Sequence, residues 1–310
     1  MDGLALSLSP QSALACQHTL KTSISCVGIG LHSGQRVRLT LRPRDADRGI
    51  TFRRTDLGVD LPARYDFVSE SRLATGLTHP SRPEARVGTI EHLMAALTGL
   101  GVDNALIELD GPEVPILDGS ASPYVFLIDC AGLVQQDAPR SVIEILRPVR
   151  VSDGEAFVEL RPATGFSSSL EMSLSIDFAA AAIGHQTVSL RLTPESFRRQ
   201  LCRSRTFALV EEVAAIQAAG LGRGGSLDNA VVVDGDRVLN PGGLRMADEF
   251  ARHKLLDAVG DLALAGAQIR GRFIAHKSGH ALNNRLMHAL FSDRAAWRYA
   301  VPESLSAAAA

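Results

Sequence analysis

The alternation of apolar and polar residues predicts a strand early in the chain. Residues 36–42 read RVRLTLR, in which Val37, Leu39 and Leu41 alternate with polar neighbours. A period of two is typical of a strand with one buried face. Pro43 is expected to end this strand, because proline has no backbone N–H for the next ladder hydrogen bond.

A similar pattern returns in the second half of the chain. Residues 157–161 read FVELR before Pro162, and every second residue of 170–178, LEMSLSIDF, is apolar. The two regions also share a short sequence, LTLRP at 39–43 and VELRP at 158–162. We interpret this similarity as an internal repeat.

Each half then reaches a predicted helix that is followed by a strand. The sequences are EHLMAALTGLGVDNALIEL from Glu91 and RHKLLDAVGDLALAGAQIRGRFI from Arg252. Thr89 is expected to cap the first helix, and Gly266 to end the second. The order of strands, helix and strand, occurring twice, predicts an α+β fold of two similar domains, each a small β-sheet layered with α-helices.

The expected domain limits follow from this repeat. Asp137 to Arg140, which read DAPR, are the predicted join between the domains. We therefore expect an N-terminal extension over 1–15, a first domain over 16–138, a second domain over 139–296 and a C-terminal tail over 297–310.

Composition narrows the class of protein. The chain has 310 residues, of which 45% are apolar and 21% charged, and a net charge of −2, so nothing in its charge favours nucleic acid or a polybasic membrane contact. No run approaches the roughly 18–20 apolar residues of a membrane span. The first 20 residues lack the basic start of a secretory signal. Four distant cysteines suit a reducing compartment, so a cytoplasmic protein is expected.

The second predicted helix carries a candidate metal ligand pair. His253, Asp257 and Asp261 are spaced by four residues, and residues i and i+4 are neighbours on a helix. A His with a second ligand at i+4 is the arrangement that lets one helix face grip a zinc ion. An isolated HxxxD pair is more often a surface hydrogen bond or an ordinary helix pair, so both interpretations stay open here.

The first repeat strengthens the metal interpretation. His92 aligns with His253 when EHLMAAL is laid on RHKLLDA. Two facing domains would then give one His each, and Asp257 would complete three ligands with a fourth position left for water. That arrangement is typical of catalytic zinc, so we form the hypothesis of a hydrolase.

Two further residues suit proton transfer. Glu91, beside His92, is a candidate general base, although a Glu in a first helical turn is also favoured by the helix dipole alone. His280, expected on a loop beyond the strand RFIAH, is a candidate general acid that Asp261 could hold charged. The alternatives are a solvated loop histidine and a surface acid.

With these residues in view, the sequence resembles the UDP-3-O-acyl-N-acetylglucosamine deacetylases of bacterial lipid A synthesis. The resemblance runs from about residue 17 to residue 290. It is carried by GIGLHSG at 28–34, TIEHLMAALTGLGVDNALIELDGPEVPILDGSASPYV at 89–125, SRTF at 204–207, RVLNPGGLRMADEFARHKLLDAVGDL at 237–262 and KSGHALNN at 277–284.

The resemblance implies an active site between two similar domains. It implies Zn²⁺ as cofactor, and Fe²⁺ also suits two His and a carboxylate. The implied roles are metal ligation by His92, His253 and Asp257, general base for Glu91, general acid for His280, orientation of His280 by Asp261, oxyanion stabilisation by Thr206, and substrate contact by Phe207 and Lys254.

The family also has an insert in its second domain that forms an apolar passage for the acyl chain. Here the insert would include the apolar stretch Ala208–Ala219, which is expected to be helical. The segment 218–226, AAGLGRGGS, is unusually rich in small residues and leaves the acyl length open. The lining candidates, for which core packing is the alternative, are Val210, Val213, Leu227 and Val232.

The sequence therefore predicts an amide hydrolase that removes acetate from UDP-3-O-acyl-N-acetylglucosamine. A related metal-dependent amidase or esterase, or an inactive nucleotide-sugar binding protein, are the alternatives. A monomer without nucleic acid or a transmembrane segment is expected. A transient contact with the inner membrane is compatible with an acylated substrate.

Overall fold

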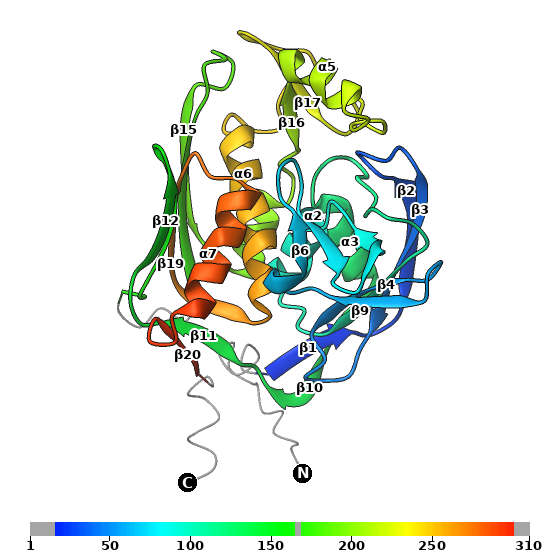
Figure 1. The fold of residues 1–310 in the computed structure, drawn as a ribbon, viewed down its shortest axis with the longest axis vertical. Helices are drawn as coiled ribbons and strands as arrows, with labels where there is room; N and C mark the ends of the chain where they lie inside the picture. The colour runs from blue at the N-terminus through cyan, green and yellow to red at the C-terminus, as the bar shows by residue number, and fades with distance from the viewer. Residues whose placement is uncertain (1–15, 165–168, 301–310) are drawn as a thin grey trace, which may run out of the picture.

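A computed structural model of the chain describes residues 16–164 and 169–300. Figure 1 shows two large sheets on opposite sides of the molecule, with helices α2, α3, α6 and α7 between them. The predicted N-terminal extension and most of the predicted tail lie outside the described residues.

The first half of the chain forms one of these sheets. Its strand order is β2-β3-β9-β4-β5, in which β9 is antiparallel to β3 and parallel to β4. The strands are β2 (Ile24–Ile29), β3 (Arg36–Pro43), β4 (Ile50–Arg54), β5 (Val59–Pro62) and β9 (Ala105–Leu109).

The second half repeats this pairing. β19 is antiparallel to β13 and parallel to β14, while β12 and β15 flank the set as antiparallel neighbours. β11 and β20 extend the sheet beside β19. The strands are β11 (Val142–Ile145), β12 (Val149–Asp153), β13 (Ala156–Arg161), β14 (Leu170–Asp177), β15 (His185–Arg191), β19 (Gln268–His276) and β20 (Trp297–Ala300). The expected α+β fold of two similar units is thus confirmed, whereas the domain limits stay a prediction.

The helices occupy corresponding places in the two halves. One helix precedes the central strand β9 or β19, and one follows it. They are α2 (Glu91–Gly99), α3 (Ser122–Ala131), α6 (Glu249–Leu262) and α7 (His280–Ser292). No helix among the described residues is both long and apolar enough to span a membrane.

Smaller elements are added to this frame. β1 (Cys16–Leu20) pairs with β10 (Leu133–Pro139), and β6 (Val68–Glu70), β7 (Gly76–His79) and β8 (Arg82–Val87) form a small sheet. β16 (Phe207–Leu209), β17 (Val231–Asp234) and β18 (Arg237–Val238) form another, next to α5 (Val210–Ala218) at the top of Figure 1. The short helical segments are η1 (Tyr65–Phe67), α4 (Pro194–Ser196), η2 (Phe197–Leu201) and η3 (Ala263–Ala265).

The hydrophobic periodicity placed the main strands correctly. Val37, Leu39 and Leu41 in β3 are fully buried, and the apolar positions of β14 face the core in the same way. Pro43 is the last residue of β3. LTLRP and VELRP fall on β3 and β13, which occupy the same position in the two sheets.

Three local expectations are wrong. Thr89 does not cap α2: Ile90 is the N-cap residue, while Thr89 has a φ of 56° and donates its hydroxyl to Glu113 Oε1. The stretch 208–219 is not helical throughout, because its first residues pair with β17 as part of β16. Trp297 to Ala300, assigned to the tail, form β20 and pair with β11. Gly266 does end the second helical segment, after a 3-10 turn, with a φ of 79°.

Candidate metal and catalytic site

The close contact of α2 with α6 brings the two halves of the chain together. Gly260 of α6 lies against the backbone of Glu91, where an ideal Cβ atom at residue 260 would be 2.0 Å from the Glu91 carbonyl oxygen. Only glycine allows so close an approach. The contact places the start of α2 beside the last turn of α6.

Three side chains from these helices converge on one point. His92 Nε2 lies 3.0 Å from His253 Nε2, and Asp257 Oδ1 lies 3.3 Å from each nitrogen. All three residues are buried. Among the described residues they form a His and carboxylate group whose ligand atoms all lie within 4.8 Å of one another, close enough to hold a metal ion.

The geometry of this group fits a divalent ion. Asp257 Oδ1 is buried and has no hydrogen-bond partner among the described residues, which is costly for a carboxylate oxygen. Tetrahedral ligands roughly 2.0–2.2 Å from an ion lie roughly 3.3–3.6 Å apart. The 3.3 Å separations of Asp257 Oδ1 from the imidazole nitrogens match that spacing.

Protonation also suits ligation. Burial lowers the pKa of His253 to about 3, so its ring is neutral near pH 7 and offers a lone pair. Burial alone would raise the pKa of Asp257, but charges on neighbouring side chains outweigh it and hold that pKa well below its usual range. One of these neighbours is Lys254, whose Nζ lies 3.1 Å from Asp257 Oδ2.

Glu91 lies next to the ligand His92 in the first turn of α2. Its side chain is 4% exposed, and burial raises the pKa of its carboxyl group. Its Oε2 accepts a hydrogen bond of 3.0 Å from the backbone N–H of Thr75. A carboxylate with a raised pKa is a stronger base than one in water, as general-base catalysis near neutral pH requires.

His280 lies beside the same group, with its Nε2 3.9 Å from Asp257 Oδ2. It is the first residue of α7 and not part of a loop as expected, with Gly279 as the N-cap residue. Its Nδ1 is 2.9 Å from Asp261 Oδ2, which also accepts a 2.8 Å hydrogen bond from Asn283. Burial works against a charged ring here, but the Asp261 carboxylate outweighs it and raises the pKa of His280 to about 9. The expected hydrogen bond between Asp261 and His280 is thus present, and the orienting role of Asp261 stays a prediction.

Comparison with known proteins shows the family of the chain. The family model described as UDP-3-O-acyl N-acetylglycosamine deacetylase matches residues 17–292. The chain belongs to this deacetylase family. A UDP-3-O-acyl-N-acetylglucosamine deacetylase of Idiomarina loihiensis is 47% identical over 287 residues, 91% of this chain and 92% of the relative. The deacetylases of the same name from Actinobacillus succinogenes and Stenotrophomonas maltophilia K279a are 46% and 45% identical, and the alignments cover 93% and 91% of this chain and 93% and 92% of those relatives.

The residues that are expected to contact the substrate, from the resemblance to the deacetylase family, lie near the candidate metal ligands. The ring of Phe207 is 5.6 Å from the ring of His253, with the two planes nearly perpendicular. Thr206 precedes it, held through its backbone by the Gly119 carbonyl at 2.9 Å and the Val231 N–H at 2.8 Å. Their roles remain predictions.

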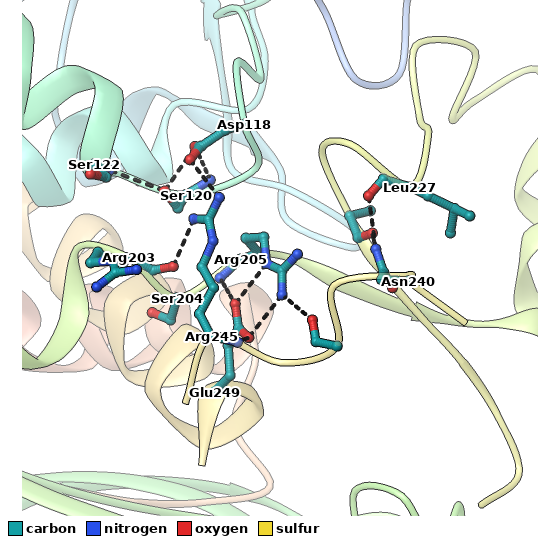
Figure 2. A network of polar contacts seen from close by, with 12 residues as sticks. Asp118, Ser120, Ser122, Arg203, Ser204, Arg205, Leu227, Asn240, Arg245 and Glu249 are labelled. Atoms are coloured by element: carbon teal, nitrogen blue, oxygen red, sulfur yellow. Dashed lines mark hydrogen bonds and ion pairs between the residues drawn. The ribbon is translucent and has the colours of Figure 1, made fainter. Parts of the chain in front are cut away.

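A buried ion pair anchors this segment to the start of α6. Figure 2 shows Glu249 accepting hydrogen bonds from Arg205, at 2.8 and 3.1 Å from its guanidinium, and from the backbone N–H of Arg245 at 2.7 Å. Arg245 in turn reaches Asp118 at 2.9 Å and the carbonyl of Arg203. The network therefore links the residues before Thr206 to the helix that carries His253.

The four predicted acyl-passage residues lie in the insert, at different depths. Val210 and Leu227 are exposed, whereas Val213 and Val232 are half-buried. A cavity of about 550 Å³ lies between the small sheet β6–β8, the loop at 32–35 and the insert loop at 220–223. Gly88 and Thr89, just before α2, also line it, so the cavity adjoins the start of the Glu91 helix.

Two residues of the site were missed from the sequence. Gly260 offered a signal, because an isolated glycine inside an apolar helix usually has a packing reason. Thr75 offered none, since it lies in an irregular segment 186 residues from its partner Asp261.

Proposed function

We propose that this protein is a zinc-dependent amide hydrolase that removes acetate from UDP-3-O-acyl-N-acetylglucosamine. The reaction leaves a free amine on the sugar and belongs to cytoplasmic lipid A biosynthesis. The observation that carries the proposal is the buried group of His92, His253 and Asp257, with Glu91 and His280 beside it. The names of the relatives, which are UDP-3-O-acyl-N-acetylglucosamine deacetylases, support the choice of substrate.

The ligands would be the two imidazole Nε2 atoms and Asp257 Oδ1. A bound divalent ion supplies a Lewis acid for the amide carbonyl and lowers the pKa of water. Glu91 accepts the proton of the attacking water, and its burial keeps that carboxylate from being solvated and weakened as a base. The hydroxyl of Thr206 donates to the oxyanion that forms on the substrate, an interaction whose loss costs on the order of 2.7–4 kcal/mol in comparable sites.

His280 completes the reaction on the leaving group. Its Nδ1 is engaged by Asp261, so its Nε2 is the atom that donates a proton to the departing nitrogen. With a pKa of about 9 the ring carries this proton near neutral pH. Together, a base that accepts a proton and an acid that carries one are what the reaction requires.

The test compares the wild type with His253→Ala and with His185→Ala, which alters an exposed histidine of β15. Each protein is dialysed, its zinc and iron content is measured, and acetate release from UDP-3-O-acyl-N-acetylglucosamine is followed. We expect about one metal ion and full activity in the wild type and His185→Ala, and loss of both in His253→Ala. A metal-free wild type that is active, or a His253→Ala protein equal to wild type, would contradict the proposal. Metal binding without acetate release would point to another amidase or esterase.

A further inference from the structure

Thr75 lies in the irregular segment between β6 and β7, directly before β7, and is 2% exposed. All three of its polar groups are used. Its backbone N–H donates to Glu91 Oε2 at 3.0 Å, its carbonyl accepts from the Ile90 N–H at 3.1 Å, and its hydroxyl donates to Asp261 Oδ1 at 2.5 Å. One residue thus contacts both the candidate base and the partner of the candidate acid.

The hydroxyl of Thr75 fixes the rotation of the Asp261 carboxylate. Oδ2 of that carboxylate is shared by His280 and Asn283, whereas Oδ1 accepts from Thr75. Without the Thr75 bond, the described contacts would hold the carboxylate through Oδ2 alone, and it could turn about its own axis. The His280 ring, hydrogen-bonded to Oδ2, would turn with it.

The backbone of Thr75 acts in the same way on Glu91. Because Oε2 accepts the Thr75 N–H, Oε1 is the oxygen left to face the attacking water. Glu91 belongs to α2 and Asp261 to α6, so the two groups come from opposite halves of the chain. Hydrogen bonds within either helix cannot set the distance between Glu91 and Asp261.

We infer that Thr75 is a positioning residue of the proposed reaction, which ties the base and the partner of the acid to one residue and so fixes their separation. This inference rests on the proposed function. The small sheet β6–β8 then contributes to catalysis, because Thr75, directly before β7, contacts Asp261 of the second half of the chain.

The test uses Thr75→Val, which keeps the shape and the backbone N–H but removes the hydroxyl, and Thr75→Ser, which keeps the donor. We expect kcat to fall by roughly 10- to 100-fold in Thr75→Val because the acid is misplaced. KM and metal content should stay near wild type, because a group that acts in the transition state does not alter ground-state binding. Thr75→Ser should recover most of the rate.

A matched control and a double mutant separate positioning from stability. Thr19→Val removes another buried hydroxyl bond, to the Asn104 carbonyl, and should keep kcat even if it melts earlier. In an Asp261→Ala background, Thr75→Val should change kcat little, because residues that act through one another are not additive. Wild-type kcat in Thr75→Val, or an equal loss in both backgrounds, would overturn the inference.

One readout needs no substrate. The Nδ1 proton of His280, assigned by its absence in His280→Gln, should shift or broaden in the NMR spectrum of Thr75→Val and stay unchanged in Thr19→Val. An unchanged signal in Thr75→Val would overturn the inference. If the wild type releases no acetate, the proposed function fails, and this comparison still decides whether Thr75 orients the Asp261–His280 pair.

Discussion

Replacing Gly260 by alanine is expected to dismantle the metal site without altering a ligand. The new Cβ atom would lie 2.0 Å from the Glu91 carbonyl oxygen and 2.7 Å from its carbonyl carbon. Because a Cβ atom needs at least about 3.0 Å from such an oxygen, α2 and α6 have to separate locally by about 1 Å. His92 moves with α2, whereas His253 and Asp257 stay on α6.

That displacement is large for a metal site. Ligand distances hold to about ±0.2 Å, so a shift of about 1 Å is several times the tolerance. We expect metal occupancy after dialysis to fall severely and kcat/KM to fall by roughly 100-fold. Helix propensity acts in the opposite direction, since alanine in place of glycine stabilises a helix by about 1 kcal/mol. Overpacking typically costs about 1–3 kcal/mol and is expected to prevail.

The assay is metal content of dialysed protein together with acetate release and thermal unfolding with and without added zinc. Gly242→Ala is the control, because nothing lies within 4 Å of its ideal Cβ position. A Gly260→Ala protein that keeps both its metal and its kcat/KM would refute the reasoning that this backbone contact sets the ligand geometry.

Two more predictions concern protonation and the buried ion pair. Burial raises the pKa of Glu91, and Asp261 raises the pKa of His280 to about 9. We therefore expect kcat/KM to rise with pH as Glu91 loses its proton and to fall as the pH passes about 9. The variant His280→Gln should abolish the alkaline fall, and a flat wild-type profile would contradict these roles. Glu249→Ala leaves the Arg205 charge buried without its carboxylate and should lower the free energy of unfolding in urea by about 3–5 kcal/mol. Arg199→Ala, from an exposed i,i+4 pair, should change it by less than about 1 kcal/mol, and equal effects of the two changes would count against this assignment.

The sequence predicted the strands because their signal is local. A strand such as β14 shows its buried face as a period of two, and no distant residue is needed to see it. The predicted N-cap residue of α2 was wrong because the signal there is not local. Threonine is a residue type favoured at N-cap positions, but the Thr89 hydroxyl donates to Glu113, 24 residues away, and the Thr89 backbone is left-handed.

The candidate ligands could be predicted because a repeated sequence links them. His92 and His253 occupy matching places in EHLMAAL and RHKLLDA, and His253 and Asp257 share a helix face. The sequence places His280 on a loop because a glycine such as Gly279 often marks a turn. In the structure Gly279 has an extended backbone and is the N-cap residue of α7. Thr75 could not be found, because its meaning depends wholly on a hydrogen bond across the interface between the two halves.

The two halves of the chain share one strand pairing, but they differ in the residues that they bring to the candidate site. In the alignment of EHLMAAL with RHKLLDA the histidines correspond, but Glu91 is matched by Arg252 and Asp257 by Ala96. Each copy therefore supplies one imidazole and lacks one of the acidic groups that the other provides. The repeat gives the site its near-symmetry, and the mismatched acids make its two sides unlike, with the proposed base Glu91 on α2 and the proposed ligand Asp257 on α6.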